Sequence, residues 1–549
     1  MTATASSAAV SATGGTVQVV EIGPGGFGDS AAAAGGGLTF TDVVAVARHG
    51  ARVELSNAAL DALGRGRATV DKLASAPTPT YGISTGFGAL ATRHIDPELR
   101  AALQRSLIRS HAAGMGPLVE PEVIRALMLL RLKTLASGHT GVRPVVAETM
   151  AQLLNLGITP AVREYGSLGC SGDLAPLAHV ALVLMGEGEV IGDDGSAVAA
   201  APVLAERGVV PLELQPKEGL ALINGTDGML GMLILALNDF DRLLKLADLT
   251  AAMSVEAQLG TDRVFRPELH AIRPHPGQAD SAANLLTLLA DSGVMASHRG
   301  PDCNRVQDAY SLRCAPQVAG AARDTLTHAA LVAEREIASV IDNPVVLFAE
   351  DGADSDGLGS VESNGNFHGA PVAFVLDFLA IAAAEVGSIA ERRTDRMLDT
   401  ARSHGLPPFL ADDPGVDSGL MIAQYTQAAL VSENKRLAAP ASVDSIPSSA
   451  MQEDHVSMGW SAARKLRGAL DNLTRILTIE LLTAARALEL RAPLQPAPGT
   501  AAAIAVLRER GVGGPGPDRY LSAELRSAEE AVRDGSVLAA VEAAVGPLR

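Results

Sequence analysis

Residues 166–179 read GSLGCSGDLAPLAH, a stretch in which glycines surround a single serine and a helical pattern follows. Apolar residues then recur every three or four positions, as on one face of a helix, at Leu174, Leu177, Ala178, Ala181 and Leu182. Ser171 is therefore expected just before the N-terminus of a helix.

The serine has two ordinary interpretations besides a special catalytic one. Ser171 or Asp173 can cap the helix while the glycines only make a turn. The serine can also be the nucleophile of a hydrolase, but the nucleophile elbow needs glycine two residues away on both sides. Asp173 occupies the second of these places, and no strand pattern leads into the serine. The residues alone leave the helix cap open as an alternative.

Around this stretch the apolar pattern is overwhelmingly helical. The sequence EVIRALMLLRLKTLASG, from Glu122, repeats apolar residues every three to four positions until Gly138 ends the predicted helix. Longer helices are expected at about 229–259, 319–341, 370–400 and 456–491, and helices of such length typically pack as a bundle. The predicted fold class is therefore mainly α, with a loop-rich N-terminal domain followed by a long-helix bundle domain.

The same pattern divides the chain into three regions. Residues 1–37 are rich in Ala, Gly and Ser with almost no charge, which predicts a disordered N-terminal extension. Residues 38–228 form the expected loop-rich N-terminal domain, and residues 229–549 form the expected long-helix domain. The acidic, glycine-rich stretch AEDGADSDGLGS, at 349–360, is expected to be a surface loop.

Composition limits the partners. The 549 residues carry 44 Lys and Arg against 62 Asp and Glu, a net charge of -18, which disfavours nucleic acid and anionic membranes as partners. The most apolar stretches contain charges such as Asp377 and Glu385 and never reach the roughly 18 uncharged residues of a membrane span. Three scattered cysteines, Cys170, Cys303 and Cys314, are too few for a disulfide framework or a four-ligand zinc site. A soluble, cytoplasmic protein is expected.

One glycine-rich segment has the glycine spacing of a dinucleotide-binding site. VQVVEI is followed by Gly23, Gly25 and Gly28, the spacing of a dinucleotide-binding turn after a strand. Pro24 and an alanine run follow instead of a helix that packs on the strand, and no strand and helix alternation comes later. We expect a glycine-rich turn and no nucleotide cofactor.

The stretch GSLGCSGDLAPLAH resembles the signature of the aromatic amino acid ammonia-lyase and aminomutase family, whose usual tripeptide is Ala-Ser-Gly. The resemblance extends from about residue 40 nearly to the C-terminus. It implies a fumarase/aspartase-like fold and a homotetramer whose active sites draw residues from three subunits. It also implies that Cys170, Ser171 and Gly172 cyclise with loss of two waters to give the prosthetic group 4-methylideneimidazole-5-one (MIO).

This chemistry explains the residue types. The Gly172 nitrogen must attack the Cys170 carbonyl, which the absent side chain permits, and Ser171 must lose its hydroxyl to become the methylidene. Cys170, which replaces the usual Ala, contributes only backbone to the ring. The positive end of the helix after Gly172 would favour electron density that builds up on the ring.

The resemblance assigns further residues by their motifs. Tyr81, in YGISTGFG, resembles the base on a mobile loop that removes the β-proton. Arg313, in RVQDAYSLRCAPQ, matches the arginine that binds the substrate carboxylate as a two-pronged donor, with Gln307 and Tyr310 lining the site. Asn224 in LINGTDGML matches an asparagine next to MIO, and Phe367 in ESNGNFHG matches an aromatic wall.

Two positions bear on substrate choice. Ser110-His111, in QRSLIRSHAAG, resembles the histidine-specific members of the family, whereas members that act on phenylalanine or tyrosine tend to have an aromatic residue or His followed by Leu. Glu453, in SSAMQEDHVSMG, matches the glutamate directed at an imidazole, where phenylalanine lyases usually place Gln. Imidazole requires polar partners of this kind. Glu453, Asp454 and His455 are consecutive and cannot easily converge on one metal ion, so no metal is expected.

The resemblance therefore implies elimination of ammonia from L-histidine to give trans-urocanate, the first step of histidine degradation. The alternatives are the same chemistry on tyrosine or phenylalanine, a 2,3-aminomutase, and a catalytically inactive scaffold that keeps the fold. The scaffold alternative predicts that Ser171 stays an ordinary serine.

Overall fold

The structure is a computed structural model that describes residues 9–10, 16–25, 37–75, 80–86, 88–300, 303, 306–348 and 359–549. The described chain is mostly helical, and its strands pair only in two-stranded sheets. The predicted mainly α fold class is confirmed.

The chain divides into two compact units, each built from separate segments. Unit 1 comprises 1–235, 330–376 and 440–464, and unit 2 comprises the remainder. The sequence led us to expect two contiguous domains, 38–228 and 229–549, so the observed division differs. The reason is that the chain leaves unit 2 twice, in the loops that join successive long helices, and these loops contribute to unit 1.

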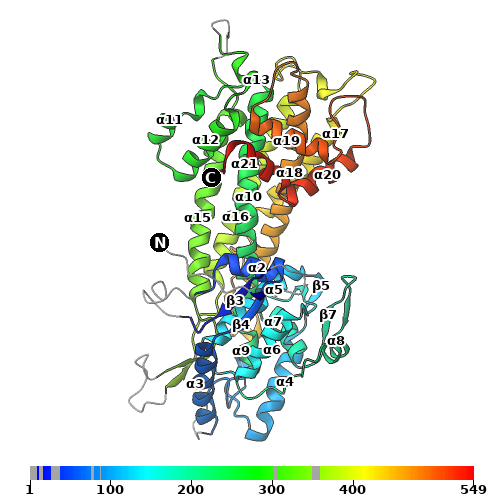
Figure 1. The fold of residues 1–549 in the computed structure, drawn as a ribbon. Coiled ribbons are helices and arrows are strands. Elements are labelled where there is room, and N and C mark those ends of the chain that lie inside the picture. Colours follow the sequence, from blue (N-terminus) through cyan, green and yellow to red (C-terminus); the bar gives the residue numbers. More distant parts are fainter. Residues whose placement is uncertain are drawn as a thin grey trace. The chain divides into compact units, whose positions relative to one another are not determined.

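Unit 1 contains shorter helices, coloured blue to cyan in its first segment (Figure 1). They are α2 Phe40–His49, α3 Asn57–Ala74, α4 Arg100–His111, α5 Pro121–Ala136, α6 Pro144–Asn155, α7 Leu174–Leu184, α8 Ala200–Glu206 and α9 Glu218–Ile223. α5 is the central one, because 13 of its 16 residues are buried. It starts with Pro121 at its first turn and ends before Gly138, which has φ +81° and lies so close to α3 that a Cβ would be 2.3 Å from the Ala62 carbonyl oxygen.

The N-terminal region is in part ordered. β3 Val19–Ile22 pairs in parallel with β4 Arg52–Leu55, and Val20 and Ile22 are buried. The prediction of a disordered extension over 1–37 is therefore wrong for this strand, because alternate apolar side chains in VQVVEI give it a face to bury. Residues 1–8, 11–15 and 26–36 lie outside the described residues, and so does Gly28, the last glycine of the dinucleotide-like spacing.

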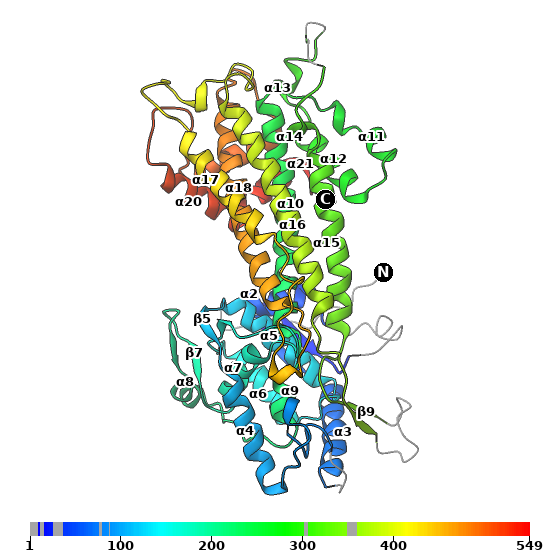
Figure 2. The same cartoon turned by 180° about the vertical axis from the view of Figure 1, so that it is seen from behind.

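Four antiparallel strand pairs also belong to unit 1. They are β1 Ala9–Val10 with β2 Thr16–Val17, β5 Met115–Leu118 with β6 Arg163–Tyr165, β7 Glu189–Ile191 with β8 Ala197–Ala199, and β9 Val345–Leu347 with β10 Ser360–Glu362. Figure 2 shows β9 close to α3, where Val346 packs against Val70 and Ile83. Residues 349–358 of the predicted surface loop lie outside the described residues, but their flanking strands pair antiparallel.

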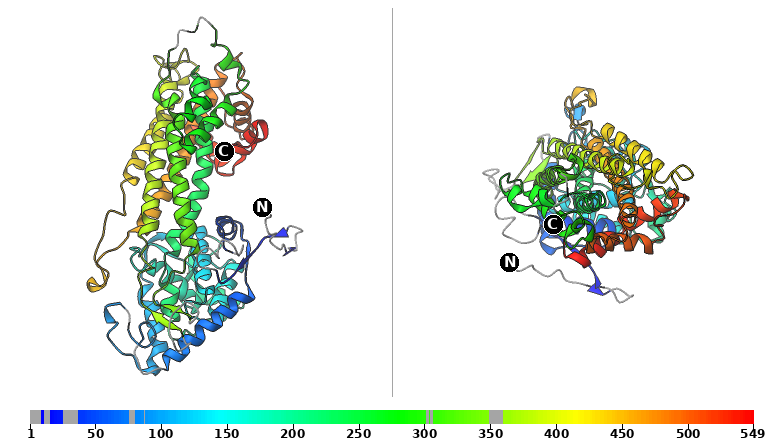
Figure 3. Two further views of the ribbon diagram at one scale, coloured as in Figure 1. Left: turned by 90° about the vertical axis from the view of Figure 1, so that its left-hand side faces the viewer. Right: turned by 90° about the horizontal axis from the view of Figure 1, so that it is seen from above.

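Unit 2 holds the larger parts of four long helices, which run side by side (Figures 1 and 3). They are α10 Asp227–Ala257, α15 Ala315–Ala338, α16 Ala370–Leu398 and α18 Gly459–Glu489, in agreement with the four long helices predicted from the sequence. Glu480 of α18 accepts hydrogen bonds from Arg393 of α16 at 2.5 Å and from Ser254 of α10 at 2.8 Å. These buried contacts fix how the helices face one another within the unit.

The remaining helices of unit 2 are short or of medium length. They are α11 Pro267–Ala271, α12 Pro276–Leu289, α13 Gly293–Ala296, α14 Tyr310–Arg313, α17 Met421–Leu437, α19 Pro498–Glu509, α20 Leu521–Arg533 and α21 Ser536–Val545.

By length and hydropathy alone, the segments 218–257 and 370–398 pass as candidate membrane spans. The most apolar window of the first segment is 100% buried inside the protein, as in the core helix of a globular domain. In the second segment the corresponding window is 56% buried.

Candidate active site

The predicted tripeptide lies in a tightly held loop before α7. Gly172 has φ +77°, and a Cβ there would be 2.1 Å from the Gly225 carbonyl oxygen, so only glycine fits. On the other side of the loop, Ser457 Oγ donates to the Gly169 carbonyl at 2.7 Å, and Gly369 N donates to the same oxygen at 3.2 Å. Segments far apart in sequence therefore confine the tripeptide.

The Asp173 side chain connects the tripeptide loop to the start of α10. This role was not predicted from the sequence. Asp173 stands at the N-cap of α7 but makes no side-chain cap there, contrary to the helix-cap interpretation. Its fully buried carboxylate instead accepts Ser167 Oγ at 2.8 Å and the Gly228 and Met229 amides at 2.9 Å, at the start of α10. Burial raises the pKa of Asp173 to about 7, against the effect of these hydrogen bonds.

Glu453 reaches the tripeptide. Ser171 Oγ donates to Glu453 Oε1 at 2.6 Å, and Cys170 Sγ donates to Oε2 at 3.1 Å. Ser448 Oγ also donates to Oε2, at 2.8 Å. Burial alone would raise the pKa of Glu453, but the hydrogen bonds from Ser171, Cys170 and Ser448 outweigh it and hold the pKa below its usual value. Glu453 is thus an anion in contact with the serine.

Cys170 is buried beside that anion. Burial and the neighbouring Glu453 carboxylate raise the pKa of the Cys170 thiol to about 12. The thiol therefore stays protonated at neutral pH and acts as a hydrogen-bond donor to Glu453, not as a nucleophile.

His111 ends α4 in a defined tautomer. Its Nδ1 lies 2.9 Å from the Leu107 carbonyl oxygen, which can only accept, so Nδ1 carries the proton. When the ring is in its neutral form, Nε2 is therefore the nitrogen that can accept a hydrogen bond.

The loop of Tyr81 approaches the segment that carries Glu453. Gly88 N donates to the Tyr81 hydroxyl at 3.3 Å, and the short turn Gly88–Leu90 packs on the turn Ser449–Met451. The loop that carries Tyr81 and the segment that it contacts therefore both belong to unit 1.

Asn224 and Phe367 also belong to unit 1. Asn224 is buried, and its Nδ2 donates to the Asn343 carbonyl at 2.9 Å, whereas its Oδ1 has no hydrogen-bond partner among the described residues. Phe367 is half-buried, two residues before the Gly369 amide that binds the tripeptide loop. Phe367 and Glu453 were both expected in the second domain, yet the structure places them in the unit of the tripeptide.

Behind the Asn224 turn lies a second feature missed from the sequence, a buried arginine. Arg131, in the middle of α5, donates to the carbonyl oxygens of Ala221 at 3.1 Å, Asn224 at 3.0 Å and Ile341 at 2.6 Å. Its Nε is 3.3 Å from Asp227 Oδ2. Arg131 therefore fixes the turn whose Gly225 presses on Gly172.

The three other predicted residues lie in unit 2. Arg313, at the end of α14, lies with its guanidinium 4.7 Å from the ring centroid of the exposed Tyr310, and its buried Nε makes no hydrogen bond within the described part of the chain. Gln307 is exposed just before α14. Tyr81, His111, Asn224, Phe367 and Glu453 thus belong to the same unit as the tripeptide, whereas Gln307, Tyr310 and Arg313 belong to unit 2.

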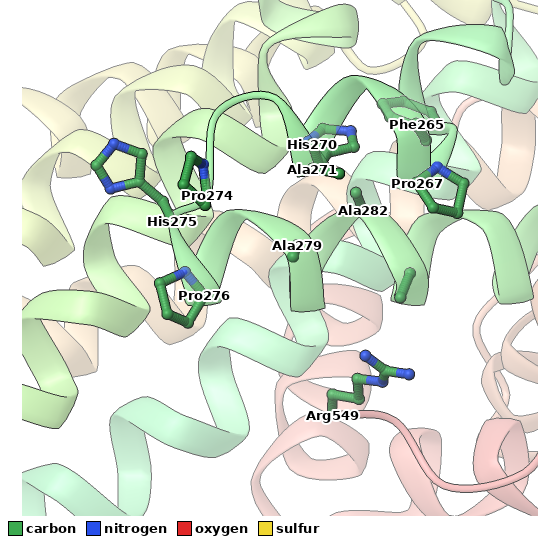
Figure 4. A pocket seen from close by; sticks show the side chains of 11 residues that line it. Phe265, Pro267, His270, Ala271, Pro274, His275, Pro276, Ala279, Ala282 and Arg549 are labelled. Atoms are coloured by element: carbon green, nitrogen blue, oxygen red, sulfur yellow. The ribbon is translucent and has the colours of Figure 1, made fainter.

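Unit 2 also contains a cavity of about 450 Å³ (Figure 4). Its walls are mostly Pro and Ala side chains, with Phe265, His270, His275 and Arg549. His270 is already bound on both ring nitrogens, by the Val264 carbonyl and Gln278. None of the site residues predicted from the sequence is among the described residues that line this cavity.

The long-helix fold, with a serine held against a carboxylate between glycine turns, is that of an all-α lyase. The chain belongs to the aromatic amino acid lyase family, whose model matches residues 38–509. It is 70% identical to a histidine ammonia-lyase of Streptomyces avermitilis over 512 residues, 93% of this chain and 98% of that protein. It is 50% identical to a histidine ammonia-lyase of Gloeobacter violaceus over 93% of this chain and 97% of that protein.

Solved structures agree with this membership. The tyrosine aminomutase of Streptomyces globisporus superposes with a TM-score of 0.86 at 40% identity, covering 93% of this chain and 98% of that one. The histidine ammonia-lyase of Trypanosoma cruzi superposes with a TM-score of 0.84 at 36% identity, covering 96% of both chains. The protein is therefore an enzyme of the carbon–nitrogen lyase class.

Proposed function

We propose that this enzyme eliminates ammonia from L-histidine and releases trans-urocanate, the first step of histidine degradation, in the cytoplasm. The observation that carries the proposal is the contact of the Glu453 carboxylate with Ser171, in the same unit as His111 at the end of α4. A base and an anion are suitable partners for an imidazole and poor partners for a phenyl ring. The names of the relatives at 50–70% identity support the same substrate.

The tripeptide fits the MIO group. Gly172 is pressed against Gly225 so closely that no side chain is tolerated, and Asn224 Oδ1 is a buried acceptor without a partner among the described residues. Cys170, Ser171 and Gly172 would form the group. MIO would supply an electrophile for the substrate amine, which is otherwise a poor leaving group.

The other residues bind, orient and move a proton. Tyr81 would accept the β-proton of the substrate at its phenolic oxygen. His111 and Glu453 would hold the imidazole ring, with His111 Nε2 accepting its N–H. Arg313 would bind the carboxylate, and the pocket would be completed by Asn224, Gln307, Tyr310 and Phe367.

We further propose that the chain acts as a homotetramer with active sites shared between subunits. α16 supports this with an apolar stripe at helical spacing, in which Phe374 is 50% exposed, Phe378 44% and Ile381 47%. The most apolar window of that helix has a mean hydropathy of 2.0, yet only 56% of it is buried in one chain. Packing against other copies would cover such a surface.

The test is incubation of the purified protein with L-histidine, L-tyrosine and L-phenylalanine. We expect ultraviolet absorbance of urocanate from L-histidine alone. Coumarate or cinnamate without urocanate would reassign the substrate. A β-amino acid formed from L-tyrosine would instead support the aminomutase alternative, which the similarity to a tyrosine aminomutase makes the main competitor.

His111→Leu is expected to lower kcat/KM for L-histidine on the order of a hundredfold, because the imidazole N–H loses its acceptor in a buried site. The constant for L-tyrosine should fall less or rise. Steady-state kinetics with both substrates check this. His49→Leu is the matched control, since His49 also ends a helix but is exposed. An equal decrease in kcat/KM for both substrates would show that His111 does not determine substrate specificity.

A further inference from the structure

Before cyclisation Ser171 still carries its hydroxyl, and the structure shows what that hydroxyl contacts. Its Oγ donates to Glu453 Oε1 at 2.6 Å. The hydroxyl is the group that must leave when the methylidene forms. The carboxylate assigned to the substrate imidazole therefore touches a reacting atom of the tripeptide before any substrate is present.

The carboxylate is held in this position by its own loop. Glu453 and Ser448 exchange backbone hydrogen bonds, from Ser448 N to the Glu453 carbonyl at 3.0 Å and from Glu453 N to the Ser448 carbonyl at 3.3 Å. Ser448 Oγ and Cys170 Sγ both donate to Oε2. Oε1 is thus directed at Ser171, and the donors around the group keep it anionic.

We propose that Glu453 is the general base and acid that dehydrates Ser171 during maturation of the enzyme. This inference rests on the proposed function, because it concerns how the same site acquires its electrophile. It gives Glu453 two successive tasks, first on the chain itself and later on the substrate.

The step balances without an external reagent. Ring closure joins Gly172 N to the Cys170 carbonyl carbon, and the carbonyl oxygen leaves as water with the protons of the Gly172 and Ser171 amides. Glu453 then removes the proton from Ser171 Cα, the carbon two bonds from the Oγ that the carboxylate contacts. The freed electron pair forms the Cα–Cβ double bond, the Cβ–Oγ bond breaks, and Glu453 returns the proton to Oγ so that it departs as water. Glu453 ends as the carboxylate that it was.

The test is the mass of the peptide that contains the tripeptide, measured on correctly assembled protein. In Glu453→Gln the side chain keeps its shape but cannot carry the proton, so the peptide should lose one water or none, where the wild type loses two. Asp454→Asn is the matched control, because it removes the adjacent exposed charge and should leave both losses intact. Loss of two waters in Glu453→Gln to the wild-type extent would overturn the proposal.

A second variant guards against misfolding. In Glu453→Ala, formate diffusing into the vacated space should restore the loss of the second water in the same preparation, and failure of formate to do so would count against a proton-transfer role. The outcome separates the two proposals. An unmodified wild-type tripeptide would contradict the proposed function itself, whereas two waters lost in Glu453→Gln without turnover of L-histidine would overturn only this inference.

Discussion

Replacing Ser171 by alanine is expected to reduce turnover of L-histidine on the order of a thousandfold or more, because the methylidene carbon of the electrophile comes from this side chain. Without it the substrate amine has no covalent acceptor, although Tyr81, His111 and Arg313 still bind and orient the substrate. The loss should appear in kcat more than in KM. The fold should persist, since within the described part of the chain the Ser171 side chain makes one hydrogen bond, to Glu453.

Urocanate formation, with light scattering to confirm the assembly, checks this result. Ser196→Ala, at an exposed turn, serves as the control that removes a hydroxyl elsewhere. Wild-type activity in a well-folded Ser171→Ala protein would eliminate the tripeptide mechanism.

Arg131→Met is expected to lower the free energy of unfolding by about 3–5 kcal/mol, the usual cost of breaking a buried ion pair. Methionine keeps an unbranched apolar stem like that of arginine but leaves the Ala221, Asn224 and Ile341 carbonyls without their donor. It also leaves the buried Asp227 without its cation, although burial already raises the pKa of that carboxyl. The turn around Gly225 should loosen with it, so maturation of the tripeptide should also slow.

Denaturant unfolding of the variant and the wild type measures the difference. Arg109→Met is the matched control, because Arg109 pairs with Glu187 at 2.7 Å on the exposed surface and its loss should hardly change the midpoint. If Arg131→Met unfolded at the same midpoint as Arg109→Met, the buried arginine would not be what fixes the Asn224 turn.

The helices could be predicted because their apolar spacing is local information. The four long helices begin and end within a few residues of the predicted bounds, and α5 ends before Gly138 as expected. The division into units could not be predicted, since it depends on where loops return. The loops before α16 and α18 bring Phe367 and Glu453 back to the tripeptide, a tertiary arrangement that no periodicity records.

Site residues could be predicted where they belong to a sequence motif. Buried residues that support the site through distant contacts could not be predicted in this way. Cys170, Ser171 and Gly172 could be named from sequence, but two of the three partners of the Asp173 carboxylate lie 55 and 56 residues away on another helix. One feature of the sequence does point to Arg131. Arg131 stands in a helix that is apolar on nearly every side, so a charge in its middle must be buried and paired. This pattern therefore marks Arg131 as a buried structural residue.

We propose that the chain converts its own tripeptide into an electrophile. The most direct measurement is the mass of the proteolytic fragment that contains Cys170, Ser171 and Gly172 from the purified wild-type enzyme. We expect a fragment lighter by two water molecules than its sequence requires. A fragment of unmodified mass, with Ser171 intact, would contradict it and leave an inactive scaffold of the same fold.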